Sequence, residues 1–362
     1  MFFSSNSHFS GPKTGPVLSA ALAISIIFGG AFVSPWVSPD GNCGLRAESL
    51  RSRVKERRQE RRQKKQEKKQ ERKQGASTEA VGQLPPYRTW INPRFRPRVA
   101  LLCVHGLGLH SGAYQFFGEK ASRRGVAVYA MDVRGFGAWM NAGGKTQVDF
   151  DGCLADVKVM LSTIRAQQPN MPVFIMGESM GGAIALRAAS MYPELVDGLI
   201  SSVPAEERFQ QKKTSVKVAM NILRPKRREF DIGSDIVNQA TTDERLKQEW
   251  KGDPLDRLDL SPKELIQFQV FMNGNHKAAS KLKPMPVLFV QGTKDKLVKP
   301  EGTWDLFNEL ASEDKVFLAV PGEHLIFEES QLQNPQVREQ NMGLVSSWML
   351  SKVIQTTVNA TR

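Results

Sequence analysis

Short apolar runs recur along the second part of the chain and are scarcely interrupted by polar residues. They are rich in Val, Leu and Ile. Strands buried on both faces of a parallel sheet show this pattern, whereas half-exposed strands alternate apolar and polar residues. We therefore expect six buried strands, at Val99–Val104, Val126–Met131, Val173–Met176, Leu199–Val203, Val287–Val290 and Val316–Val320.

Helical patterns separate these runs. Apolar residues between Leu154 and Ile164 and between Leu306 and Leu310 recur at the spacing of a helix face, and those from Val337 to Val353 do so less strictly. Strands that alternate with helices predict an α/β fold, with a mostly parallel sheet and helices on both of its faces.

One interval breaks this alternation. Between Pro204 and Pro284 the chain has no clear strand and much charged sequence with helical character. We expect a helical cap here, at about residues 206–283, inserted into a single folded domain that spans residues 85–362.

An uncharged segment lies near the start of the chain. Val17–Val33 is apolar or small throughout. Its length is at the short edge of a membrane span of about 17–25 residues and is long for a signal-peptide core of about 7–15. For residues 1–37 two interpretations stay open: an anchor that makes the protein membrane-associated, or a signal that is cleaved and leads to secretion. Because the basic charge follows this segment, a retained anchor would leave the folded domain in the cytoplasm.

The basic charge of the chain is concentrated in residues 38–84. Arg51–Lys73 holds thirteen Lys and Arg residues against four Glu, a net charge of +9, which leaves +4 of the total of +13 for the rest of the chain. We expect a solvated charged helix followed by a linker. It is either a spacer or a segment that is attracted to anionic lipid head groups. Nucleic-acid binding is not indicated, since no aromatic residues are interleaved with the basic ones.

A serine stands in the setting of a catalytic nucleophile. Gly177-Glu178-Ser179-Met180-Gly181 follows the strand Val173–Met176 directly and precedes a run of small residues. A G-x-S-x-G sequence at a strand–turn–helix junction forces the serine into a strained conformation and exposes its hydroxyl above the sheet. The helix that follows directs its N-terminus at the reaction centre, where it favours negative charge.

A serine hydroxyl needs a base, and His324 is the best candidate among five histidines. His8, His105 and His110 precede Ser179, whereas the base of such a triad follows the serine and the acid. His276 falls in the expected cap. His324 follows the strand Val316–Val320, in a loop at the end of a strand where ligands gather in open α/β sheets.

The acid and the oxyanion donors complete the predicted site. Asp295 lies just past the strand Val287–Val290 and is favoured over Asp305 and Asp314, which fall within and near the end of the next helix. Two N–H groups should stabilise the oxyanion, one from Met180 and one from the loop after Val99–Val104, where Leu107 is the best donor. We expect His105 to brace that loop.

No metal or organic cofactor is indicated. The three cysteines, Cys43, Cys103 and Cys153, have neither even pairing nor metal-ligand spacing. Cys103 lies within an apolar run and should be a small buried side chain.

Several motifs resemble those of monoacylglycerol lipases and related lysophospholipases, within the serine aminopeptidase S33 type of α/β-hydrolase. The resemblance runs from about Tyr87 to the C-terminus. It rests on five motifs. A Tyr-x-x-Trp sequence lies at Tyr87–Trp90, H-G-x-G-x-H-S-x-x-Y at His105–Tyr114 and D-x-R-G-x-G at Asp132–Gly137. The motif G-E/H-S-M-G-G lies at Gly177–Gly182 and G-x-x-D at Gly292–Asp295.

The resemblance implies an α/β-hydrolase fold with an eight-stranded sheet and a helical cap over the pocket. It implies Ser179, Asp295 and His324 as the triad, and activity on small-molecule esters of a single acyl chain through an acyl-enzyme. Leu109 stands where the family often has Glu. The expected cap is partly basic, which leaves room for an anionic substrate, with cationic residues at Lys212, Lys213, Lys217, Arg224, Lys226, Arg227 and Arg228.

Other functions share this fold. A peptidase for small N-terminal residues and a thioesterase use the same machinery, so sequence alone does not separate them from an esterase. A membrane-tethered binding protein without catalysis is the alternative from another class, and the filled triad positions argue against it.

Overall fold

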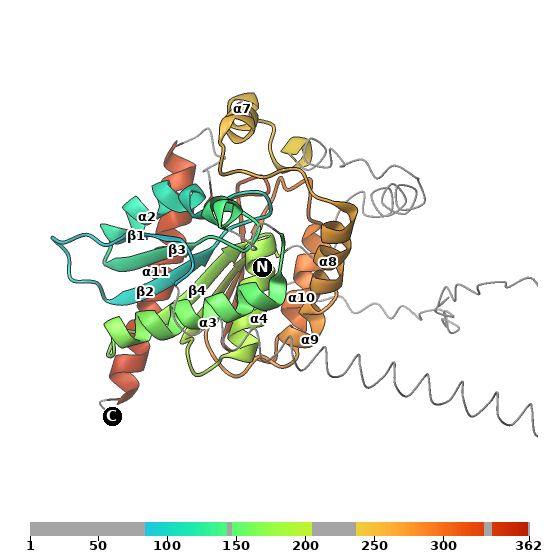
Figure 1. Ribbon diagram of the computed structural model, residues 1–362. Coiled ribbons are helices and arrows are strands. Elements are labelled where there is room, and N and C mark those ends of the chain that lie inside the picture. Colours follow the sequence, from blue (N-terminus) through green and yellow to red (C-terminus); the bar gives the residue numbers. More distant parts are fainter. Residues whose placement is uncertain (1–83, 143–146, 205–236, 329–334, 361–362) are drawn as a thin grey trace, which may run out of the picture. The chain divides into compact units, whose positions relative to one another are not determined.

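A seven-stranded sheet lies at the centre of the computed structural model, which describes residues 84–142, 147–204, 237–328 and 335–360 (Figure 1). The strand order is β1-β3-β2-β4-β5-β6-β7. Only β1 is antiparallel to its neighbour, and the other neighbouring strands in the sheet are parallel. The strands are β1 (Tyr87–Trp90), β2 (Val99–Val104), β3 (Val126–Met131), β4 (Val173–Glu178), β5 (Gly198–Ser202), β6 (Val287–Gly292) and β7 (Lys315–Val320).

All six predicted strands are present. Two of them, β2 and β3, have the predicted bounds. Strands β4, β6 and β7 differ by one or two residues at one end, and β5 differs by one residue at each end. The resemblance implied eight strands, whereas the described residues form seven. The strand that the apolar pattern missed is β1, whose residues are largely exposed at the edge of the sheet and therefore form no apolar run.

The other edge strand corrects a second expectation. We predicted β7 as a strand buried on both faces, but only Val320 of its six residues is buried, and Val316 is exposed. An edge strand has one neighbour, so helices cover it less completely than the central strands.

Alternate residues of the central strands point into two separate cores. Ala100, Leu102 and Val104 of β2 face one core, and Val99, Leu101 and Cys103 face the other. This is the period of two that an extended chain imposes. It confirms that Cys103 is a small buried side chain.

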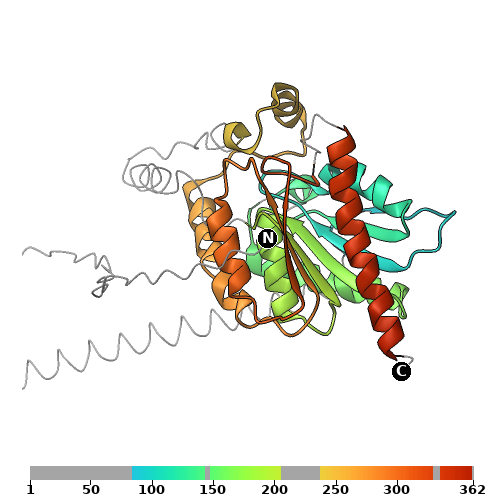
Figure 2. The same cartoon turned by 180° about the vertical axis from the view of Figure 1, so that it is seen from behind.

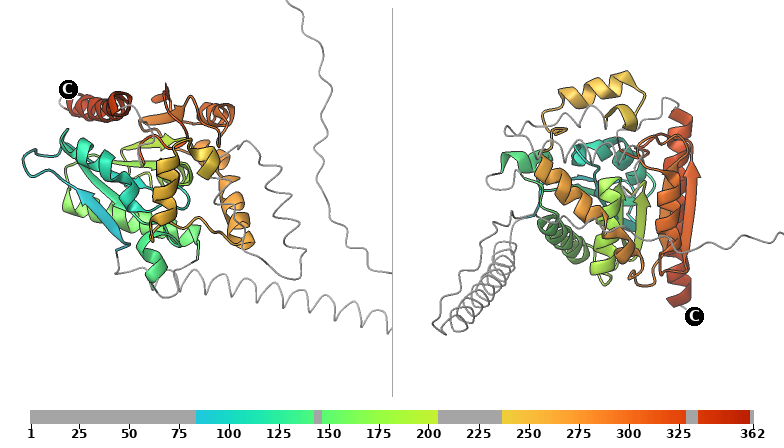
Figure 3. Two further views of the ribbon diagram at one scale, coloured as in Figure 1. Left: turned by 90° about the horizontal axis from the view of Figure 1, so that it is seen from above. Right: turned by 90° about the vertical axis from the view of Figure 1, so that its right-hand side faces the viewer.

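Helices cover both faces of the sheet. Helices α3 (Phe150–Gln167), α4 (Met180–Met191), α8 (Pro262–Met272), α9 (Asn275–Ala279) and α10 (Pro300–Asn308) contribute to the first core. The second core is covered by α2 (Gln115–Ser122) and α11 (Pro335–Ala360). Figure 2 shows α11 running along the back of the sheet, and the side view in Figure 3 places it on the face opposite α8.

Further short elements lie beside the loops that follow the strands. They include the 3-10 helices η1 (Ser111–Tyr114) and η2 (Gly137–Asn141) and the helix α7 (Glu244–Gly252), which Figure 1 shows at the top of the domain. A third, smaller apolar cluster joins α7 to the loops after β2, β6 and β7, through residues that include Leu246, Trp250, Leu109, Leu297 and Leu325.

The described part of the predicted cap consists of α7, α8 and α9. Helix α8 begins with a capping box, in which Ser261 and Glu264 satisfy each other's backbone N–H groups. Its last residues pack on the body of the domain, where Phe271 stacks on Phe150 of α3 with ring centroids 4.4 Å apart. The basic residues between Lys212 and Arg228 lie outside the described residues.

The expected anchor or signal at Val17–Val33 and the basic segment Arg51–Lys73 also lie outside the described residues. Among the residues that the structure does describe, no helix combines the length and the apolar character needed to cross a bilayer.

Candidate active site

The turn between β4 and α4 holds Ser179 in a strained backbone conformation. Its φ is 55° and its ψ is −116°, a region that residues other than glycine rarely adopt. A Cβ at Gly177 would overlap the carbonyl of Gly181, and a Cβ at Gly181 would overlap the carbonyl of Val104 on β2. Both glycines are therefore required by close packing, as expected for a turn that projects a serine above the sheet.

Neighbouring strands fix this turn in place. The N–H of Ser179 donates to the carbonyl oxygen of Ser202 at the end of β5, at 2.9 Å. Val203, the residue after β5, is the other non-glycine residue with positive φ in the described part of the chain, at 38°. Strain thus concentrates at the carboxyl ends of two adjacent strands, which is where strained residues at functional sites are found.

His324 and Asp295 form a buried pair. The Nδ1 atom of His324 lies 2.9 Å from Oδ2 of Asp295, and both side chains are almost completely buried. Because a carboxylate only accepts hydrogen bonds, Nδ1 carries the proton and donates it, which leaves Nε2 as the acceptor nitrogen. The backbone N–H of His324 also bonds to the carbonyl of Ala240, 3.3 Å away.

The loop after β6 stabilises the charge of Asp295. The N–H groups of Leu297 and Val298 donate to its Oδ1 at 2.8 and 3.0 Å. Burial opposes ionisation of this carboxyl, but His324 and these donors outweigh burial and hold its pKa below the ordinary value. Asp295 is therefore ionised near neutral pH, as a residue that orients and stabilises an imidazolium must be.

The rival acids lie elsewhere. Asp305 is exposed on α10, and Asp314 pairs with Lys352 of α11 at 2.6 Å. Of the candidates considered from the sequence, the structure therefore places Asp295 against His324.

The described histidines His105 and His276 are bonded to groups other than Ser179. His105 is fully buried, and its Nε2 accepts from the N–H of Val133 at 2.9 Å while its Nδ1 donates to the carbonyl of Gly106 at 2.8 Å. Burial lowers its pKa to about 4. This confirms that His105 braces the loop. His276 is exposed on α9 and pairs with Glu309.

The two backbone N–H groups predicted as oxyanion donors belong to segments that adjoin the serine turn. Met180 begins α4 directly after Ser179, and Leu107 belongs to the loop after β2. Within the described residues neither N–H donates to a protein acceptor, so both remain available to an oxyanion. The N-terminus of α4 adds a favourable partial positive charge at the same point.

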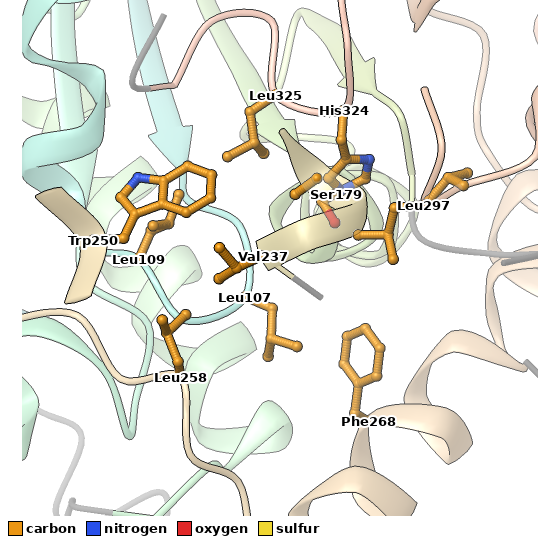
Figure 4. Close-up of a pocket in the computed structure, with 12 residues that line it drawn as sticks. Leu107, Leu109, Ser179, Val237, Trp250, Leu258, Phe268, Leu297, His324 and Leu325 are labelled. Atoms are coloured by element: carbon orange, nitrogen blue, oxygen red, sulfur yellow. The ribbon is translucent and has the colours of Figure 1, made fainter. Parts of the chain in front are cut away.

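Ser179 and His324 line one pocket, shown in Figure 4. The cavity that these residues enclose is small, with a volume of about 40 Å³. All the other residues that line it are apolar: Leu107, Leu109, Val237, Ala240, Trp250, Leu258, Phe268, Leu297, Val298 and Leu325.

The structure brings the three predicted residues Ser179, Asp295 and His324 into one region, but sequence reasoning missed part of the surroundings. Val237, Trp250, Leu258 and Phe268 line the pocket from the region that was predicted only as a cap. Their spacing along the chain gives no signal, because they come from different elements and a long loop. Among the described residues no group of three His, Cys, Asp or Glu side chains is arranged to hold a metal ion.

Comparisons with known proteins identify the family of the chain. The model of the family described as "Serine aminopeptidase, S33" matches residues 96–331. The chain is similar to a putative monoglyceride lipase of Schizosaccharomyces pombe, with 27% identity over 65% of this chain and 64% of that protein. It is also similar to the monoglyceride lipase of Homo sapiens, with 28% identity over 73% of this chain and 87% of that one.

A solved structure supports the fold. A soluble variant of monoglyceride lipase from Saccharomyces cerevisiae, crystallised with a substrate analog, superposes with a TM-score of 0.63 and 22% identity, over 74% of this chain and 96% of that one. The resemblance inferred from the motifs is therefore confirmed. Since the family model covers more than half of the chain, this protein belongs to the serine aminopeptidase S33 family and is a lipase-like hydrolase with the α/β-hydrolase fold.

Proposed function

We propose that the protein hydrolyses carboxylic esters of single acyl chains, of the monoacylglycerol or lysophospholipid type, with Ser179 as nucleophile, His324 as base and Asp295 as the acid that orients it. The observation that carries the proposal is the strained Ser179 lining the same apolar pocket as a histidine that is hydrogen-bonded to a buried carboxylate. A serine without such a histidine is a poor nucleophile near neutral pH.

The reaction has two steps. Ser179 Oγ attacks the ester carbonyl while Nε2 of His324 takes its proton, and the C–O bond to the leaving alcohol breaks as His324 returns the proton to that oxygen. Water then attacks the acyl-enzyme with the same proton transfers, which releases the carboxylic acid and restores Ser179. The N–H groups of Leu107 and Met180 hold the oxyanion in both steps.

The pocket lining favours an acyl chain as the bound group. Ten of the twelve lining residues are apolar, and the other two are Ser179 and His324. Burial of each methylene of a chain in such a site contributes about 0.8 kcal/mol. The similar proteins named as monoglyceride lipases support the same class of substrate.

A substitution of the nucleophile tests this proposal. Ser179→Ala should lower kcat on a nitrophenyl ester by about 10⁴-fold or more, because the oxyanion donors and the pocket alone accelerate the reaction only modestly. The parent should bind a fluorophosphonate covalently and the variant should not. A Ser179→Ala protein as active as the parent refutes the proposal.

A substrate panel separates the esterase from related functions. Monoacylglycerols, lysophospholipids, acyl thioesters and aminoacyl amides of matched size differ in head group or leaving group but not in the machinery they need. We expect the highest kcat/KM on the monoacyl esters. A preference for aminoacyl amides would instead identify a peptidase.

We also propose that Val17–Val33 is either an anchor that keeps the enzyme at a membrane, with the basic segment near anionic lipid, or a signal whose cleavage leads to secretion. The mass of the mature protein tests this, since an N-terminus beyond Pro35 excludes a retained anchor.

A further inference from the structure

A buried glutamate precedes Ser179 and accepts four hydrogen bonds. Glu178 is the last residue of β4 and is fully buried. The N–H of Ile326 and the hydroxyl of Ser202 donate to its Oε1, at 2.8 and 2.7 Å. The N–H groups of Phe327 and Glu328 donate to its Oε2, at 2.9 and 2.8 Å. Three of the four donors thus belong to the loop that carries His324.

A second buried glutamate extends this arrangement to the oxyanion loop. Glu328 is fully buried, and both of its carboxylate oxygens accept from the N–H of Gly106, at 2.8 and 2.9 Å. Gly106 directly precedes Leu107, the proposed oxyanion donor. A Cβ at Gly106 would lie 3.0 Å from Oε2 of Glu328, so little space separates the loop from the carboxylate.

The two carboxylates connect the three parts of the proposed machinery. Glu178 directly precedes Ser179 in the chain, and its side chain binds the backbone of residues 326–328, just after His324. The side chain of Glu328 binds the backbone of Gly106, just before Leu107. The connected residues are 148 to 222 positions apart in the chain. These side-chain bonds therefore link loops that no local secondary structure connects, in addition to the pairing of the strands that precede them.

We infer that Glu178 and Glu328 are positioning residues, which together set the placement of His324 and of the Leu107 N–H relative to Ser179. Neither side chain lines the pocket, so they act through the backbone and not on the substrate. The inference rests on the proposed function, because it assigns roles relative to that nucleophile and base.

The arrangement requires a carboxylate at position 178. Each oxygen of Glu178 faces two donors, and a carboxylate accepts at both oxygens. In Glu178→Gln one oxygen becomes an NH₂ group. If it replaces Oε1, the Ser202 hydroxyl can reverse its role, but the N–H of Ile326 is left facing another donor. That N–H lies two residues after His324.

The test is to measure kcat and KM of Glu178→Gln. The concentration of active enzyme is determined by titrating Ser179 with a fluorophosphonate, so that misfolded protein is not counted. A small displacement of a catalytic group costs about 100-fold, so we expect kcat to fall about 10- to 100-fold with KM within about twofold. Asp156→Asn is the matched control. It also removes a buried carboxylate charge, from the ion pair with Arg134 at 2.6 Å, and should lower stability without lowering kcat per titrated serine.

A milder variant covers the case in which Glu178→Gln does not fold. Glu328→Gln keeps one acceptor oxygen for Gly106, so we expect kcat to fall about two- to tenfold. If both variants fold, the double variant should lose less than the product of the two single losses, because the residues act through one connected structure.

The outcomes separate this inference from the proposed function. Parental kcat in folded Glu178→Gln and Glu328→Gln, together with an inactive Ser179→Ala, overturns the positioning roles and leaves the hydrolase intact. Strictly multiplicative losses, or an equal loss of kcat in Asp156→Asn, overturn them as well. An active Ser179→Ala instead overturns the proposed function.

Discussion

The pocket wall and the floor beneath Ser179 are built by opposite means. The wall consists of apolar side chains from several loops and from α7 and α8, which contact a ligand without directional bonds. The floor consists of His105, Glu178, Asp295 and Glu328, all buried at the ends of the strands and all hydrogen-bonded. Hydrogen bonds fix positions and apolar contacts mainly fix volume. The floor should therefore be intolerant of substitution where the wall is tolerant.

The largest expected effect is on the floor, at the acid. Asp295→Asn keeps the shape of the side chain but loses the charge and can favour the wrong tautomer of His324, so kcat should fall by about 10⁴-fold. KM should change little, because Asp295 does not line the pocket. Steady-state kinetics check this. A loss below tenfold would mean that the floor tolerates change as the wall does.

A second test of the floor measures how the stability of the protein depends on pH through His105. The pKa of His105 is lowered by burial from 6.5 to about 4. Between these values the unfolded chain binds the proton and the folded chain does not, so this residue's contribution to stability is present above about pH 6.5 and is lost as pH falls toward 4.

His105→Gln removes that titration. From pH 7 to pH 4.5 the parent should lose about 2–3 kcal/mol more of its free energy of unfolding than the variant does. Urea unfolding of both proteins at the two pH values measures the difference, and the other titrating groups cancel between them. Equal losses would contradict a buried neutral His105.

The smallest effect is expected on the wall. Leu258→Ala shortens an apolar side chain that lines the pocket. It should raise KM for a long-chain monoacyl ester by about tenfold, since about 1.4 kcal/mol of apolar contact is lost, and leave kcat within about threefold. Progress curves on esters of increasing acyl length measure this. A fall in kcat as large as that of Asp295→Asn would break the distinction between wall and floor.

The difference between wall and floor also explains what the sequence could predict. Ser179 is recognisable because its turn requires glycines at fixed neighbouring positions, and His324 and Asp295 because strand order limits where they can stand. Glu178 and Glu328 give no such signal. Their backbone partners in the loops after β7 and β2 are 148 to 222 residues away, so only the folded chain brings them together.

The sheet divides in a similar way. The central strands were predictable because burial on both faces leaves an unbroken apolar run, as in β2 and β3. Strand β1 has exposed residues and is defined by its pairing with β3, from Tyr87 opposite Met131 to Trp90 opposite Val128. Pairing between distant segments leaves no local sequence pattern. The wall residues Val237 and Leu258 were not predicted either, because they too are brought to the pocket only by contacts between distant segments.

The backbone angle at Ser179 has an energetic meaning for the whole molecule. A non-glycine residue at φ 55° raises the free energy of the native state by about 1–3 kcal/mol, in a protein whose total stability is of the order of 5–15 kcal/mol. Glycine would relax this turn and abolish the hydroxyl together. At this position the demand for stability therefore opposes the demand for a nucleophile, and a search for heat-resistant variants would tend to discard the side chain proposed to carry the reaction.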